Sequence, residues 1–193
     1  MKARRWARPL TVPALAIALA LSACAGSGGA SRDWVAPDAG LTSSMSVAVI
    51  PFENLTNHPN AGIIVSQLVT TEIYRQGVFL PVEDSIVRNR LADLGIDAAE
   101  IGEAVFAQQL AELLGASAVL TGSVSEYGYQ HGLREEPTVG FNLRLVAAGD
   151  GRVLWAASYS DIGRGVLSRD SVNALAQAVA GRMVSALRTH VRR

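Results

Sequence analysis

The feature that most limits what this chain can fold into is its single cysteine, Cys24, which stands at the end of a short apolar segment. One cysteine allows no disulfide within the chain, so any folded part must be held by an ordinary apolar core. Four basic residues and no acidic residue precede the apolar run over residues 10–21. That run is shorter than the roughly 20 residues that a helix needs to cross a bilayer. A retained anchor is therefore the less favoured alternative, and residues 1–23 are predicted to be a secretory signal that is removed.

The end of this segment carries a second signal. Leu21, Ser22, Ala23 and Cys24 match the bacterial lipobox, in which small residues fit the signal peptidase and the cysteine thiol takes a diacylglycerol. The freed amine of the cysteine can take a further acyl chain, such as palmitate, and two or more chains hold a protein stably at a membrane. Ala25 comes next, where aspartate would retain the protein at the inner membrane. The sequence therefore predicts a lipid anchor at Cys24 and a domain on the periplasmic face of the outer membrane.

Composition limits the mature part of the chain. Removing 23 of the 193 residues leaves 170, which suits one domain with a tether. The whole chain has 17 basic and 17 acidic residues, and four of the basic ones leave with the signal, so the mature net charge is −4. No basic surface remains that would indicate a nucleic-acid partner. Residues 24–45 are rich in Gly, Ser and Ala and are predicted to be the lipidated cysteine and a flexible tether, with Trp34 either docked or simply tolerated.

The first half of the remaining domain, residues 46–193, alternates predicted strands and helices. Apolar spacing, β-branched runs and glycine stops predict strands over 46–52 and 78–82 and helices over 61–76, 86–94 and 104–114. Pro81 places the second of these strands at a sheet edge, because proline donates no hydrogen bond to a ladder.

The second half has a different pattern. Strands are predicted over 118–129, 139–146 and 152–160, joined as an antiparallel meander and followed by a long helix over about 168–190. Along the middle strand apolar residues alternate with Gly140, Asn142 and Arg144, so one face is buried and the other wet. Trp155 is expected in the core. The predicted class is α/β or α+β, with a single mixed β-sheet, an antiparallel C-terminal meander, helices packed on the sheet and a long C-terminal helix.

Three segments resemble a known family when they are taken together. Val47-Ala-Val-Ile-Pro-Phe-Glu-Asn-Leu-Thr56, Ala118-Val-Leu-Thr-Gly-Ser-Val124 and the pair Phe141–Val146 with Gly151–Trp155 are similar to segments of CsgG-type curli-secretion lipoproteins and LpoB-type activators of penicillin-binding proteins. The resemblance covers residues 46–190. CsgG-type channels insert membrane hairpins at two places, which correspond here to Tyr127–Thr138 and Asp161–Leu167. Both gaps are too short for a complete hairpin of ~9–11 residues per strand, so the resemblance implies the periplasmic domain without a channel.

The search for chemistry is mostly negative. His58, His131 and His190 are far apart in the sequence, and no metal-ligand pairing, nucleophile motif or phosphate loop is present. We therefore predict no enzyme activity, no cofactor and no metal. Tyr127 and Tyr129 share one face of a strand and lie near His131 and Arg134. Since exposed Tyr and Arg are favoured at protein interfaces, these four residues are candidates for partner binding, and packing against the last helix is the alternative.

Two functions fit these observations. In the first, the protein is a non-enzymatic accessory protein or adaptor in cell-envelope biogenesis that binds a periplasmic protein partner. The resemblance implies regulation of a peptidoglycan synthase, or secretion and assembly, as the process served. In the second, self-association makes it a structural subunit of a homo-oligomeric ring in an outer-membrane secretion or assembly complex.

Overall fold

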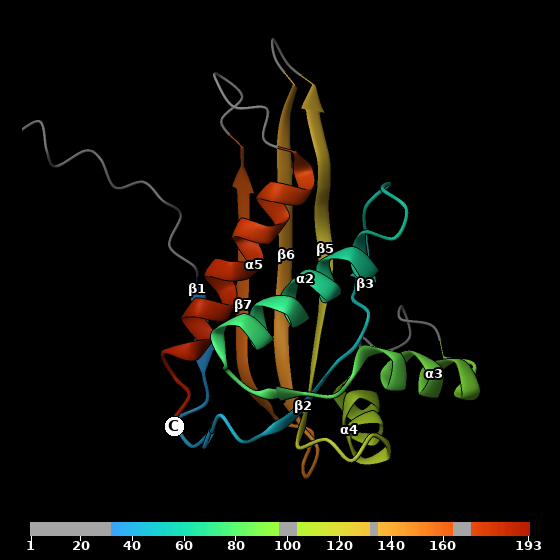
Figure 1. Cartoon of the computed structure of the whole chain (residues 1–193), viewed down its shortest axis with the longest axis vertical. Coiled ribbons are helices and arrows are strands. Elements are labelled where there is room, and N and C mark those ends of the chain that lie inside the picture. The colour runs from blue at the N-terminus through green and yellow to red at the C-terminus, as the bar shows by residue number, and fades with distance from the viewer. Residues whose placement is uncertain (1–31, 97–103, 132–134, 164–170) are drawn as a thin grey trace, which may run out of the picture. The chain divides into compact units, whose positions relative to one another are not determined.

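The computed structural model describes residues 32–96, 104–131, 135–163 and 171–193. They contain one seven-stranded mixed sheet with strand order β1-β7-β6-β5-β2-β4, and β3 pairs with β5 beside this path (Figure 1). This arrangement confirms the predicted α+β class with a single mixed sheet. The strands are β1 (Arg32–Val35), β2 (Ser46–Val49), β3 (Glu53–Asn54), β4 (Leu80–Pro81), β5 (Ala118–His131), β6 (Glu135–Ala147) and β7 (Val153–Ile162).

Four described helices accompany the sheet, namely α2 (Ala61–Gln76), α3 (Asp84–Leu94), α4 (Ala104–Leu113) and α5 (Val172–Arg188). The bounds of α2 are those predicted, because Gly77 ends the helix in the left-handed conformation, φ 61°, that glycine adopts without strain. The side chain of Ser171 caps α5 by accepting a hydrogen bond from the N–H of Ala174. Residues 168–170 of the predicted last helix lie outside the described residues.

The three long strands form the predicted antiparallel meander. β5 and β6 stay paired as far as His131 and Glu135, so the loop predicted between Tyr129 and Val139 is wrong for its described residues, 130–131 and 135–138. Residues 132–134 lie outside the described part. The carbonyl of Pro137 accepts a hydrogen bond from the N–H of Gly163 at 2.8 Å, so the backbone groups of this residue face away from β5. The N–H that proline lacks therefore removes no hydrogen bond between β5 and β6. We call residues 125–131 of β5 and 135–140 of β6 the hairpin arm; its end lies at the top of Figure 1.

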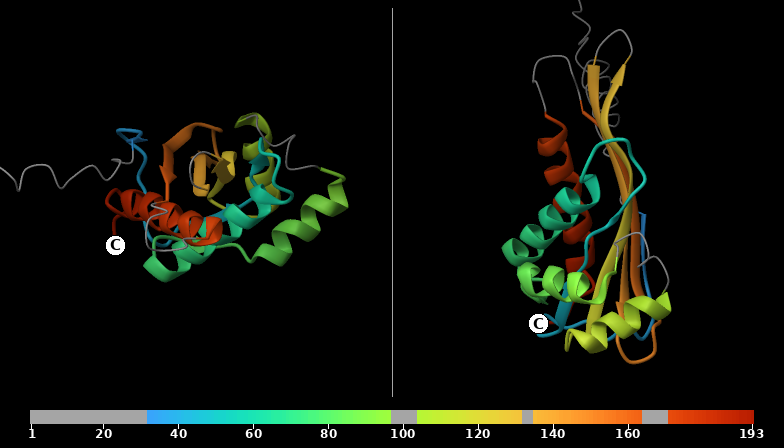
Figure 2. Two further views of the ribbon diagram at one scale, coloured as in Figure 1. Left: turned by 90° about the horizontal axis from the view of Figure 1, so that it is seen from above. Right: turned by 90° about the vertical axis from the view of Figure 1, so that its right-hand side faces the viewer.

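The two faces of the sheet are covered differently. Helices α2 and α5 pack on one face and bury the larger apolar cluster, which includes Trp155, as predicted. Helices α3 and α4 form the smaller cluster with the opposite face, where Val119 and Val146 lie. Figure 2 shows that this second face is left open further along the meander.

Strand β1 lies within the segment that was predicted to be tether. It pairs antiparallel with Trp155–Ser158 of β7, and the backbone of Thr42 forms a bridge with Arg192. Leu41 is 2% exposed in the main core. The prediction of a flexible tether is therefore wrong from residue 32 onward, because backbone pairing, rather than a run of apolar residues, places this segment in the fold.

Candidate functional site

The hairpin arm carries the tyrosines that were predicted to share a face, and both contact the start of α5. The hydroxyl of Tyr127 donates a hydrogen bond to Asn173 Oδ1. The N–H of Val172 donates to the hydroxyl oxygen of Tyr129 at 3.4 Å. Both contacts agree with the packing alternative, in which the tyrosines position the last helix.

The two tyrosines differ in exposure. Tyr127 is 5% exposed and Tyr129 is 46% exposed. Burial raises the pKa of the Tyr127 hydroxyl, and the neighbouring Tyr129 raises it further, so Tyr127 stays protonated and donates to α5. Tyr127 therefore belongs to the core, and Tyr129 is the tyrosine of this pair that a partner can reach.

A loop between β3 and α2 supports the base of the arm. The ring of His58 lies 4.9 Å from the ring of Tyr127, at a tilted angle. Asn54 fixes this loop, because its side-chain amide donates to the carbonyl of His58 at 2.9 Å and its oxygen accepts from the N–H of Thr56 at 3.1 Å. The residues that come after the first predicted strand thus close a loop and orient a histidine against the arm.

Other predicted site residues cannot be placed as fully. His131 is the last residue of β5, where its backbone pairs with Glu135, and its side chain lies outside the described part. Arg134 and the lipobox residues Leu21, Ser22, Ala23 and Cys24 also lie outside the described residues.

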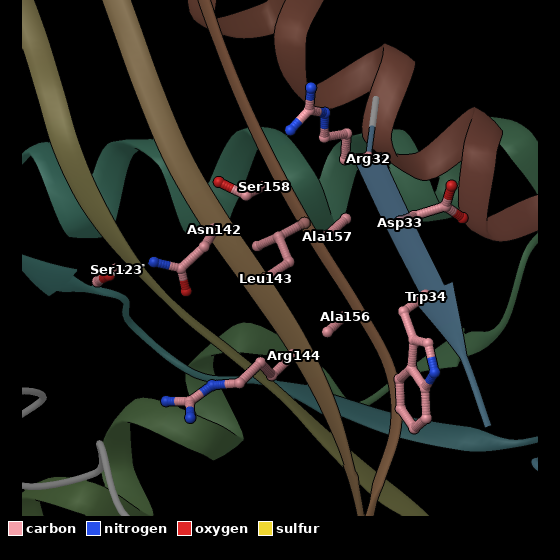
Figure 3. A pocket seen from close by; sticks show the side chains of 10 residues that line it. All are labelled: Arg32, Asp33, Trp34, Ser123, Asn142, Leu143, Arg144, Ala156, Ala157 and Ser158. Atoms are coloured by element: carbon pink, nitrogen blue, oxygen red, sulfur yellow. Dashed lines mark hydrogen bonds between the residues drawn. The ribbon is translucent and has the colours of Figure 1, made fainter. Parts of the chain in front are cut away.

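A second surface occupies the open face of the sheet, where a shallow groove of 590 Å³ crosses four strands (Figure 3). Its lining combines small apolar residues such as Ala156 with polar ones, and the side-chain amide of Asn142 donates to Ser123 Oγ at 2.5 Å. Trp34 of β1 stands at one side and is 52% exposed. The wet face of the middle strand was predicted from its alternation. The tryptophan was missed as part of this surface, because β1 was assigned to the tether.

One carboxylate, that of Asp33, forms the hydrogen bonds that hold strand β1 beside this groove. Asp33 Oδ2 accepts hydrogen bonds from Trp155 Nε1 at 3.1 Å and from His190 Nε2 at 2.9 Å. Trp155 comes from β7 and His190 lies just after α5, so Asp33 joins the first described strand to the C-terminal end of the chain.

Among the described residues, no group of three or more His, Cys, Asp or Glu side chains is placed to hold a metal ion. The described helices include none with the length and hydrophobicity needed to cross a membrane. In this part of the chain, the exposed part of the arm and the groove on the open face are the two candidate surfaces for binding.

A comparison with known families identifies the family of this chain. The sequence model of the GNA1162-like lipoproteins matches residues 40–192, which is most of the chain. The chain belongs to the GNA1162-like lipoprotein family. The matched range begins before β2 and so includes part of the segment that was predicted to be tether. A comparison with curated proteins gives no match.

Solved structures share the fold of this GNA1162-like lipoprotein. GNA1162 from Neisseria meningitidis is 25% identical, with a TM-score of 0.57 and coverage of 76% of this chain and 96% of the other. PelC from Paraburkholderia phytofirmans, described as a dodecamer, is 24% identical, with a TM-score of 0.63 and coverage of 84% and 98%. LpoB from E. coli is 21% identical, with a TM-score of 0.50 and coverage of 64% and 59%.

These comparisons bear on the resemblance predicted from the sequence. They support its LpoB-type part at the level of the lipoprotein fold. They give no support to its CsgG-type part, and the GNA1162-like family takes that place.

Proposed function

We propose that this GNA1162-like lipoprotein is anchored in the outer membrane through acylated Cys24, faces the periplasm, and acts as a non-enzymatic accessory protein in cell-envelope biogenesis. The observation that carries the proposal is Tyr129, which is 46% exposed on the hairpin arm. A half-exposed tyrosine on a paired strand is a favoured contact at protein interfaces. His131 and Arg134 come after it in the sequence and complete the proposed partner-binding site, for regulation of a peptidoglycan synthase or for a secretion or assembly machine.

The length of the linker limits where the partner can be. Residues 25–31 separate Cys24 from β1. Seven residues span at most about 25 Å when fully extended. A partner at the outer membrane or in the adjacent peptidoglycan is within reach of this protein, and one that stays at the inner membrane must itself extend across the periplasm.

Fatty-acid labelling tests the anchor. Cells that express the full chain are given a labelled palmitate, and the membranes are then separated. We expect label and outer-membrane fractionation for the parent and for the control Ser27→Ala, and loss of both in Cys24→Ala. The anchor is refuted if the parent takes up no label, or if Cys24→Ala still fractionates with the outer membrane.

Photo-crosslinking in intact cells tests the partner site. A photoreactive residue is placed at Gln130, exposed on the arm, or at Asn89, exposed on α3 as a control. We expect a defined protein to be joined at Gln130 and not at Asn89, and the product to weaken when Tyr129→Ala is added. Equal crosslinking at both positions, or none at Gln130, contradicts the assignment of the arm.

A second candidate function is a subunit of a homo-oligomeric ring. Large apolar side chains are exposed at both edges of the sheet, Trp34 (52%) on β1 and Leu80 (59%) on β4. A head-to-tail contact between copies needs two different surfaces on each molecule, and such contacts close into rings when the rotation allows. PelC, which shares the fold, is described as a dodecamer. Light scattering on residues 25–193 decides: a concentration-dependent oligomer that Trp34→Ala weakens supports this function, and a monomer at high concentration excludes it.

A further inference from the structure

Strand β5 is paired unequally on its two sides. On one side it pairs with β6 along its whole length, as far as His131. On the other side its pairing with β2 and β3 ends at Val124, whose carbonyl accepts a hydrogen bond from the N–H of Leu55 at 2.9 Å. We call residues 127–131 of β5 the arm edge; no described strand pairs with it on this second side.

The register shows which backbone groups face outward at the arm edge. Tyr129 lies opposite Pro137, which has no N–H and whose carbonyl already accepts from Gly163 on the β7 side. Tyr129 and Pro137 therefore form a non-hydrogen-bonded pair, in which the N–H and C=O of each residue point away from the other strand. The same holds two residues away along β5, so Tyr127 and His131 also direct backbone groups outward.

Proteins usually protect such an edge with prolines, charges or bulges, because unpaired strand groups are a template for another chain. The register shift between Val124 and Glu126 and the exposed carboxylate of Glu126 act in this way at the base of the edge. Further along, Gly128, Tyr129 and Gln130 carry neither charge nor proline. A Cβ atom added to Gly128 would meet nothing within 4 Å, so the sheet face at this residue is open and a neighbouring side chain of a bound strand would have room there.

We propose that the arm edge binds an extended segment of the partner protein as an added β-strand. This deepens the function proposed above and rests on it. The outward groups repeat every two residues, at a rise of ~3.3 Å per residue, and an extended polypeptide backbone presents donors and acceptors at the matching repeat, which identifies the class of ligand. The bound strand carries apolar residues beside Tyr129 and a basic residue beside Glu126.

A different chain fits this edge better than a second copy does. If two copies paired antiparallel about Gly128, the residue opposite Glu126 would be Gln130, since 126 and 130 are equidistant from 128. That pairing offers the carboxylate no basic side chain. Charge complementarity therefore favours a partner strand with arginine or lysine at this position.

A peptide probe tests the proposal on ¹⁵N-labelled residues 25–193. The probe is a nine-residue peptide of alternating valine and arginine, and its control carries an N-methyl group at every residue, which removes its backbone donors. We expect the probe to shift the amide signals of Tyr127 and Tyr129, and the control to bind at least about tenfold more weakly. Charge attraction is the same for both, so it cannot produce this difference.

Two variants isolate the backbone of the protein itself. Tyr129→Ala and Tyr129→Pro both remove the ring, but only proline removes the outward N–H. We expect Tyr129→Pro to bind the probe about fivefold more weakly than Tyr129→Ala, the factor of one net hydrogen bond. Thermal unfolding should separate the two variants little, because this N–H makes no bond to β6. If Tyr129→Pro does not fold, the comparison of the two peptides still decides.

Three results would overturn strand addition: equal binding of probe and N-methylated control, equal binding by the two Tyr129 variants, or a dimer of residues 25–193 that Tyr129→Pro abolishes. The accessory function fails separately. If the cellular crosslink at Gln130 forms while the probe and its N-methylated control bind equally, strand addition is refuted and the accessory function is not. If the probe binds as expected and no cellular partner is crosslinked at the arm, strand addition at the arm edge is supported and the accessory function is refuted.

Discussion

Replacing Asp33 by alanine tests whether β1 belongs to the fold or to the tether. Asp33 accepts hydrogen bonds from Trp155 Nε1 and His190 Nε2. Trp155 is 0% exposed, so its N–H loses its acceptor without gaining water. A buried donor left without a partner costs about 1–3 kcal/mol. The imidazole of His190 is partly exposed and can bond to water, so it adds less. We expect the free energy of unfolding to fall by about 2 kcal/mol.

Urea and thermal unfolding of residues 25–193, followed by tryptophan fluorescence, measure this loss. A domain of this size should show a Tm lower by about 4–8 °C. Asp93→Ala, exposed on α3, is the control and should change stability by no more than about 0.5 kcal/mol. Asp33→Ala should also have much less effect in a Trp155→Phe background, because phenylalanine has no N–H to leave unpaired. If Asp33→Ala behaves like the control, β1 is not held by this carboxylate and the reasoning is refuted.

Two further predictions concern the core. A hydrogen bond from Arg75 holds the pKa of the Glu72 carboxyl below its ordinary value. The ionised carboxylate therefore stabilises the fold fully above the ordinary glutamate range, and this stabilisation is lost as the pH falls. Glu72→Gln should flatten the acid limb of a curve of stability against pH, and an unchanged limb would contradict this. Gly122→Ala places a Cβ 2.1 Å from the carbonyl oxygen of Asn142 and should lower the free energy of chemical unfolding by more than about 2 kcal/mol. In Gly128→Ala the added Cβ meets nothing within 4 Å, so the loss of stability should be far smaller. Equal losses of stability in the two variants would argue against the close approach of the strands at Gly122.

The helices could be predicted from the sequence because their signals are local. In α2 the apolar residues recur at helical spacing, and Gly77 supplies the left-handed residue that ends the helix. The edge position of β4 was predictable from Pro81 alone. In each case the deciding residues lie within a few positions of the element that they define.

The sequence-based predictions were wrong where residues distant in the sequence determine the local structure. Arg32–Val35 has no clear strand pattern, and it is a strand because it pairs with the edge of β7 that β6 does not occupy, more than 100 residues away in the sequence. Pro137 favoured a loop, yet it lies in register with Tyr129 because its backbone groups face β7, where its carbonyl accepts from the N–H of Gly163. The shared face of Tyr127 and Tyr129 was predictable from strand alternation, but their contacts with Asn173 and Val172 depend on where the last helix packs.

The pairing of β1 also determines how far the proposed anchor lets the domain move. With β1 in the sheet, the linker after Cys24 is residues 25–31, about 25 Å at full extension. If β1 and the residues up to Gly40 were released, the linker would grow to residues 25–40, about 55 Å, before the buried Leu41 stops it. The hydrogen bonds of Asp33 therefore contribute to limiting this reach, together with the β1–β7 ladder and the ion pair between Asp38 and Arg152. In cells, Asp33→Ala should extend the distance at which the arm can be crosslinked, and Asp93→Ala should leave it unchanged.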